Sequence, residues 1–87
     1  MSRIEAMRVH LAALDPASLE IIDESHQHAG HAGSREGGGH YLLRIVSPQF
    51  IGKSTITRHR MIYSALGAMM KREIHALNIQ ANTPDEV

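Results

Sequence analysis

The chain has 87 residues, which is enough for one small domain and little else. Hydrophobic residues make up 43% and charged residues 21%, a balance typical of a globular fold and too apolar for a disordered chain. The absence of cysteine excludes disulfides, thiolate nucleophiles and metal sites built from thiolates of this chain. No apolar run approaches the roughly 18 residues that span a bilayer, and the N-terminus lacks a signal-peptide core, so we expect a cytoplasmic protein without membrane contact.

The charges of the chain cancel, but they are unevenly distributed. Nine basic and nine acidic side chains give a formal net charge of zero, whereas the stretch from Arg44 to Arg72 holds six Lys or Arg and no Asp or Glu. A segment with one sign of charge can form a positive patch on a neutral protein. It fits a binding surface for nucleic acid or an acidic partner, and it fits equally a solvated helix face that lacks acids.

The first half of the chain predicts a helix, a strand and a long loop. A capping box at Ser2 and Glu5 is followed by apolar residues at helical spacing as far as Leu14. Residues 18–25 alternate apolar and polar side chains, which predicts a strand. Residues 26–39 show no period and contain five of the seven glycines together with three histidines, so they predict a long loop rich in His and Gly.

The next stretch predicts a second strand and a long helix. Residues 40–47 are rich in Leu, Ile and Val and predict the strand. The helix is predicted to begin after the N-cap Ser54 and to end with Lys71 and Arg72, where cations favour the helix dipole. Its apolar stripe consists of Ile56, His59, Ile62, Tyr63, Leu66, Met69 and Met70.

The last stretch completes the predicted fold. Residues 75–80 alternate, with His75 on the same face as the apolar residues, and predict a third strand. At the start of this strand, His75 could either pack or project. Thr83 and Pro84 then start a short helix. A helical crossover makes the second and third strands parallel, whereas the first two are antiparallel. The expected fold is α+β, with one mixed three-stranded sheet covered by helices in a single domain spanning residues 1–87.

Motifs for catalysis are missing. Residues 52–54 read Gly-Lys-Ser, like the end of a phosphate-binding loop, but Ser47 stands where that loop requires glycine. No G-x-S-x-G motif exists, and the adjacent Asp23 and Glu24 point to opposite faces of a strand. We therefore expect a protein that is not an enzyme.

The seven histidines are the one unusual feature of the composition. His26, His28 and His31 lie in the glycine-rich stretch, and imidazole is a common ligand of borderline metals, although a solvated loop without metal is the simpler interpretation. His59 lies on the apolar stripe, where a histidine more often packs than ligates. Two or three histidines cannot complete a tetrahedral site, so any metal would take further ligands from a partner.

Three motifs make this sequence resemble the BolA family. They are Phe50-x-Gly52-Lys53-Ser54, Arg58-His59-Arg60-Met61-Ile62-Tyr63 and Ile74-His75-Ala76-Leu77, in this order. The resemblance extends from about Ile4 to Glu86, essentially the whole chain. It implies a fold of the αββαβ type, similar to class II KH domains, which agrees with the order of elements expected from the pattern.

The resemblance also implies a partner and a cofactor. Members of the family pair with monothiol glutaredoxins around a shared 2Fe–2S cluster, which the glutaredoxin cysteine and glutathione ligate on the partner's side. On the BolA side it implies His75 and a loop residue, a Cys in one branch of the family and a His in the other, which matches His28. His31 and His26 remain alternatives in the same loop. No cofactor is expected in the isolated chain, which we expect to be a monomer or a weak homodimer.

A second function is implied because some BolA-like proteins are described as DNA-binding transcriptional regulators. The turn at residues 52–55 lacks the second glycine of the G-x-x-G loop with which KH domains grip a nucleic-acid backbone. Lys53, Arg58 and Arg60 would supply phosphate contacts, and the helix around His59 would form part of the partner or DNA surface. Since aromatic residues for stacking are nearly absent, duplex DNA is the expected nucleic-acid target.

Overall fold

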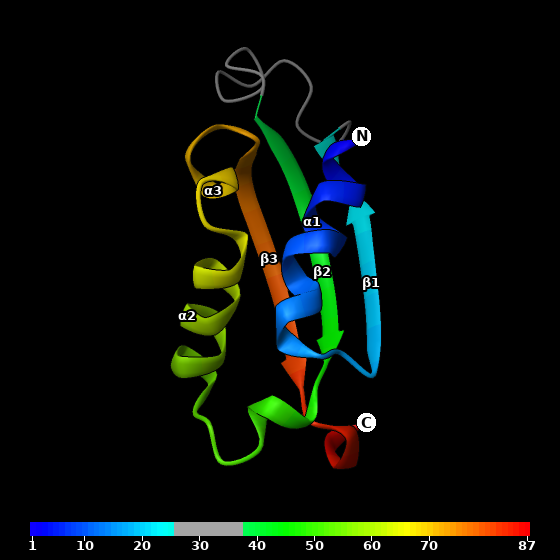
Figure 1. Ribbon diagram of the computed structural model, residues 1–87, viewed down its shortest axis with the longest axis vertical. Coiled ribbons are helices and arrows are strands. Elements are labelled where there is room, and N and C mark those ends of the chain that lie inside the picture. The colour runs from blue at the N-terminus through cyan, green and yellow to red at the C-terminus, as the bar shows by residue number, and fades with distance from the viewer. Residues whose placement is uncertain (26–37) are drawn as a thin grey trace.

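The computed structural model describes residues 1–25 and 38–87, and their elements follow the predicted order (Figure 1). The helices and strands are α1 (Arg3–Leu11), β1 (Ser18–Asp23), β2 (Gly39–Val46), α2 (Thr55–Leu66), α3 (Met69–Arg72) and β3 (Ile74–Asn82). Among the described residues, η1 (Ala12–Leu14), η4 (Pro48–Phe50) and η5 (Pro84–Glu86) are 3-10 turns. The predicted loop at 26–39 lies almost entirely outside the described residues, and Gly39 belongs to β2.

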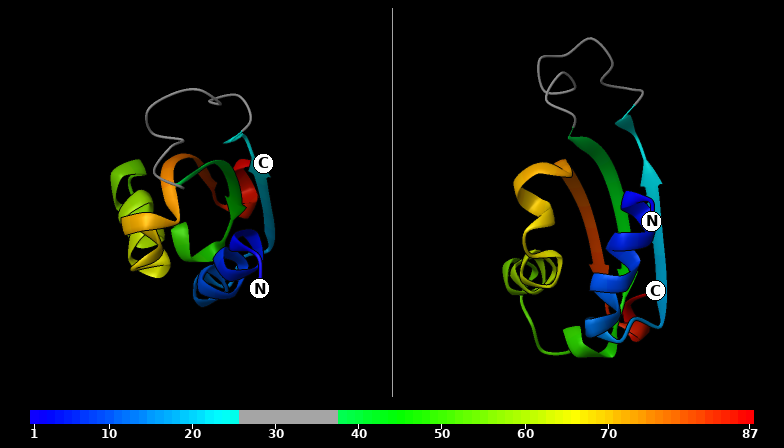
Figure 2. Two further views of the ribbon diagram at one scale, coloured as in Figure 1. Left: turned by 90° about the horizontal axis from the view of Figure 1, so that it is seen from above. Right: turned by 45° about the horizontal axis from the view of Figure 1, so that its top comes forward.

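The sheet has the predicted mixed topology, with β2 in the centre. β1 pairs with β2 in antiparallel register, and β2 pairs with β3 in parallel register. The helices lie on one side of the sheet (Figure 2). The expected α+β class and the single three-stranded sheet are therefore confirmed. Within the described residues, no helix is long and apolar enough to cross a membrane.

The core lies between the sheet and the helices. Alternate residues of β2, Tyr41, Leu43 and Ile45, point to this side because successive side chains of a strand face opposite ways. The helical and turn residues that are fully buried against them are Met7, Leu11, Phe50, Ile62 and Leu66. The predicted N-caps also form, since the Ser2 and Ser54 hydroxyls accept hydrogen bonds from backbone N–H groups three residues later.

The predicted long helix differs from the structure in two ways. It is divided at Gly67, which adopts a left-handed φ of 55° after α2 and redirects the chain so that Met69 of α3 is buried. The predicted apolar stripe is also partly wrong, because Ile56 is 65% exposed and Tyr63 is 42% exposed. The face that packs on the sheet carries Ile62 and is therefore rotated away from these two residues.

Candidate functional site

The candidate site lies at the end of the sheet where β1 ends and where β2 and β3 begin (Figure 1). Backbone hydrogen bonds hold these three strand ends together. The Glu24 N–H donates to the His40 carbonyl at 2.7 Å, and the Gly39 N–H donates to the Glu73 carbonyl at 3.0 Å. The His40 N–H donates to the Ser25 hydroxyl at 3.0 Å. These contacts fix the strand ends on which the candidate residues are placed.

A register shift at the start of β3 sets the position of His75. Gly39 is opposite Ile74, but the next residue, His40, is opposite Ala76, so His75 has no Cα partner on β2. In a regular strand, side chains three positions apart face opposite ways. The extra residue of the bulge lets Ile74, which is 2% exposed, and Leu77 both face the core. His75 is exposed as a result. The expectation that His75 shares a simple alternating face with Leu77 misses this bulge.

Two glycines allow the chain to approach this bulge closely. A Cβ on Gly38 would lie 2.7 Å from the Cβ of His75 and 3.1 Å from the Arg72 carbonyl oxygen. A Cβ on Gly39 would lie 2.5 Å from the ring of Tyr41. The distances of 2.7 Å at Gly38 and 2.5 Å at Gly39 are far shorter than a normal contact. A larger residue at either position would therefore force its neighbour to move. The last two glycines of the glycine-rich stretch are thus explained by packing around His75 and Tyr41.

His75 also contacts a second histidine. The ring centroids of His40 and His75 are 5.0 Å apart, and the ring planes are inclined by 49°. His40 is only 9% exposed, whereas His75 faces solvent. Beside His75 is a small pocket of about 210 Å³, which Lys71 and Arg72 also line. The pocket thus brings an exposed histidine and two basic residues to the same part of the surface, which favours a ligand with negative charge.

The described residues alone do not make a complete metal centre. Across residues 1–25 and 38–87, no group of three or more His, Cys, Asp or Glu side chains could hold a metal ion. Any metal held at His75 would therefore take its other ligands from outside the described residues. The other predicted ligand, His28, and its alternatives His31 and His26 lie outside the described residues. Ser25 and Gly38, which flank that stretch, both lie at the His75 end of the sheet.

The predicted basic surface is at the opposite end of the sheet, and Arg58 there is held by the fold. Its guanidinium donates to the Lys53 carbonyl at 2.9 Å and to the Ala81 carbonyl at 3.1 Å. It also forms two hydrogen bonds with the Glu86 carboxylate, at 2.6 and 3.1 Å. The side chain of Arg58 is only 12% exposed. The guanidinium thus makes four hydrogen bonds within the chain.

The other members of this surface differ in exposure. Lys53 and Arg60 are exposed, and His59 is half-buried. The hydrogen bonds with Arg58, followed by the one from the Thr83 N–H, lower the pKa of Glu86 to about 2. The hydrogen bond with Glu86 in turn raises the pKa of Arg58. The sequence does indicate that Glu86 is held in place, because Thr83 and Glu86 have the spacing of a capping box. The structure contains this capping box.

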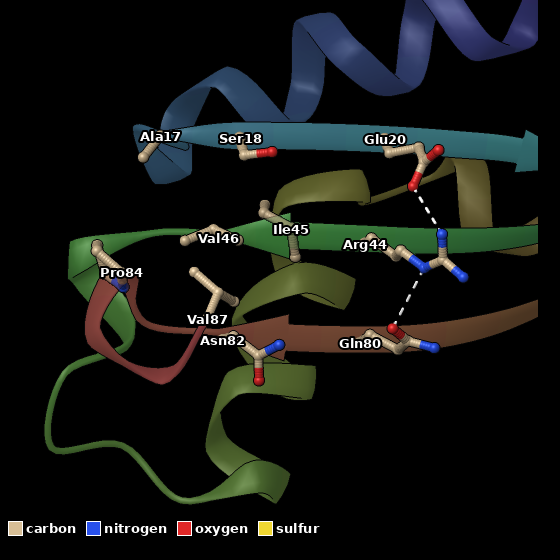
Figure 3. Close-up of a pocket in the computed structure, with 10 residues that line it drawn as sticks. All are labelled: Ala17, Ser18, Glu20, Arg44, Ile45, Val46, Gln80, Asn82, Pro84 and Val87. Atoms are coloured by element: carbon tan, nitrogen blue, oxygen red, sulfur yellow. Dashed lines mark hydrogen bonds and ion pairs between the residues drawn. The ribbon is translucent and has the colours of Figure 1, made fainter.

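One further hollow was not anticipated from the sequence. It has a volume of about 490 Å³ and lies between the sheet and the C-terminal turn, lined by residues of all three strands (Figure 3). Arg44 crosses the sheet beside it, donating to Glu20 of β1 at 2.9 Å and to Gln80 of β3 at 3.3 Å. These three residues are directly opposite one another in the strand register. Only the register brings them together, so a single sequence gives no sign of the arrangement.

Comparison with known proteins identifies the family. The family model described as BolA-like protein matches residues 11–86. The chain belongs to the BolA-like family. The predicted membership is thereby confirmed, and the description of the family names no catalytic reaction.

Relatives of the BolA-like chain come from plants, bacteria and mammals. SufE-like protein 1, chloroplastic/mitochondrial, of Arabidopsis thaliana is 52% identical over 79 residues, which cover 85% of this chain and 21% of the relative. Protein BOLA1, chloroplastic, of the same plant is 39% identical over 89 residues, covering 98% of this chain and 56% of the relative. The DNA-binding transcriptional regulator BolA of Escherichia coli (strain K12) is 40% identical over 75 residues, covering 86% and 69%. The chain thus spans less than two thirds of both plant relatives.

Solved structures agree with this membership. The BolA domain of SufE1 from Arabidopsis thaliana superposes with a TM-score of 0.86 at 49% identity, covering 100% of this chain and 98% of that one. BolA1 from the same plant gives a TM-score of 0.84 at 36% identity, with the same coverage. Both plant relatives are named for organelles, so the cytoplasmic location of the BolA-like chain stays a prediction.

Proposed function

We propose that this BolA-like chain is a non-enzymatic adaptor in iron–sulfur cluster handling, which pairs with a monothiol glutaredoxin around a shared 2Fe–2S cluster. The observation that carries the proposal is the exposed imidazole of His75, displaced from the strand register by the bulge and supported by close packing at Gly38. A ligand on a strand is held more precisely than one on a loop, and the residues on either side of His75 are both paired with β2. His75 is the ligand contributed by the sheet.

The remaining ligands follow from the chemistry of the donors. The chain has no thiolate, so the cysteine ligands come from the partner and from glutathione. The second ligand from this chain is His28, with His31 and His26 as alternatives, on the strength of the family resemblance. Replacing thiolates by imidazoles makes a bound cluster less negative and raises its reduction potential. Lys71 and Arg72 beside His75 add positive charge, which favours association with an anionic cluster.

The test is an anaerobic titration of cluster-loaded monothiol glutaredoxin with this chain in the presence of glutathione, followed by visible absorption and circular dichroism. We expect a saturable spectral change at one-to-one stoichiometry that His75→Ala abolishes. His10→Ala, which removes an exposed histidine on α1, is the matched control and should leave the titration unchanged. An unchanged spectrum with the wild-type chain would contradict the cluster role.

DNA binding is the second candidate, favoured by the name of the E. coli relative. The acid-free segment from Arg44 to Arg72 offers Lys53 and Arg60 as exposed cations at the predicted surface. The double variant Lys53→Ala with Arg60→Ala should weaken binding to duplex DNA and reduce the slope of affinity against salt by about two, because each phosphate contact contributes about one unit. Arg3→Ala, a change of exposed charge on α1, is the control. Equal salt slopes for all three proteins would remove the physical basis of this function.

A further inference from the structure

The ring pair of His40 and His75 joins a fixed residue to an exposed one. His40 lies on the central strand, and its backbone N–H and carbonyl are both hydrogen-bonded to the end of β1. Its side chain is buried, including both ring nitrogens. His75 is exposed at the bulge, and its ring lies 5.0 Å from that of His40. The His40 ring is therefore a rigid surface against which the His75 imidazole packs.

This contact bears on ligation because His75, at the bulge, has no Cα partner on β2 whose side chain would restrict it directly. The backbone at Gly38 passes so close to His75 that an added Cβ would lie 2.7 Å from the His75 Cβ, but only a neighbour of the ring can restrict the ring itself. The tilted arrangement of the two rings, at 49°, is of the kind that aromatic pairs favour. Hydrogen-bonded partners that orient a metal-bound histidine typically change metal affinity by 10- to 100-fold when removed, and a partner that orients it by packing should act at the lower end of this range.

We propose that His40 is a positioning residue, whose buried ring holds the His75 imidazole in one orientation ready for ligation. The proposal rests on the assignment of His75 as a cluster ligand and adds a second histidine that acts by packing. The ring contact of His40 with His75 is the observation that carries this role, so the flat ring of His40 should be sufficient for it. His40→Phe should therefore retain the effect, whereas His40→Ala should lose it.

The first test needs no cluster and uses the free chain. Three-bond couplings and NOEs of the His75 side chain measure its χ1 distribution by NMR. We expect one dominant rotamer in the wild type and in His40→Phe, and an average over several rotamers in His40→Ala. A wild-type His75 that is already averaged, or a distribution that His40→Ala leaves unchanged, would overturn the proposal. If His40→Ala does not fold, His40→Leu, which lacks a flat ring, takes its place.

The second test is the titration with cluster-loaded glutaredoxin. His40→Ala should weaken association by about tenfold, and His40→Phe should restore it to within about threefold with an unaltered circular dichroism spectrum. His10→Ala is again the control. A loss in His40→Phe as large as in His40→Ala, or a changed cluster spectrum, would overturn the packing role and indicate that His40 is itself a ligand. If His75→Ala leaves the cluster spectrum intact, the cluster role fails, while the NMR measurement still decides whether His40 orients His75.

Discussion

The two ends of the sheet use their polar residues in opposite ways. At the end where β2 and β3 finish, Arg58 forms hydrogen bonds with the Glu86 carboxylate and with the Ala81 carbonyl. These hydrogen bonds hold the C-terminal turn against the start of α2. At the other end, β3 carries an extra residue, and His75 is turned out to solvent beside the buried His40. A closed end contributes stability, whereas an end that presents an imidazole outward is available for a partner. The two ends should therefore respond differently to substitution.

The largest loss of stability is expected at the closed end, from Phe50→Ala. Phe50 is fully buried on η4, and the Arg58 guanidinium lies over its ring, 6.0 Å from the ring centroid. Truncating Phe50 leaves a cavity and also removes the ring that the Arg58 guanidinium contacts, so we expect a cost of about 3–5 kcal/mol in the free energy of unfolding. Urea denaturation measures this cost. Tyr63→Ala, which truncates an exposed aromatic on α2, should cost less than about 1 kcal/mol, and equal costs would contradict the assigned core.

Gly38→Ala should cause a smaller loss of stability than Phe50→Ala, at the open end of the sheet. Its Cβ would be 2.7 Å from the His75 Cβ and close to a backbone oxygen, so we expect about 1–3 kcal/mol of destabilisation together with displacement of His75. Gly52→Ala is the comparison, because Gly52 has φ of 77° but open space around it. Both variants lose stability, but only Gly38→Ala should shift the NMR resonances of the His75 ring. Unshifted resonances would show that the close approach does not hold His75.

The Glu86 carboxylate predicts a smaller loss that depends on pH. Its pKa of about 2 in the folded chain is below the ordinary 4.5, so the unfolded chain binds more protons between these values. The stabilisation is therefore complete above about pH 4.5 and is lost as the pH falls towards about 2. Glu86→Gln should flatten this part of the profile of unfolding free energy against pH, whereas Glu5→Gln, on the first turn of α1, should leave it unchanged. Parallel wild-type and Glu86→Gln profiles would contradict the ion pair.

The comparison of the two ends also shows what the sequence could predict. Alternation and helical spacing were sufficient for the order of elements and the mixed sheet, because those periods reflect which side chains are buried. The motif around His75 located the candidate site. The bulge was not predictable, because it depends on the register against Gly39, and a slip of one residue reverses the faces of a strand. The engagement of Arg58 by Glu86 joins residues 28 positions apart, which a local pattern cannot connect.

The smallest effect on stability, and the sharpest test of the comparison, is expected from His75→Ala. Because the His75 side chain is exposed, its removal should change the free energy of unfolding by no more than about 0.5 kcal/mol, while abolishing the spectral change with cluster-loaded glutaredoxin. Its neighbour Ile74 is 2% exposed, and Ile74→Ala should cost about 2–5 kcal/mol. Two adjacent residues of β3 thus have different roles: Ile74 stabilises the core, and His75 is exposed for a partner. A cost for His75→Ala above about 1.5 kcal/mol would instead make His75 part of the packing, because surface substitutions rarely cost so much.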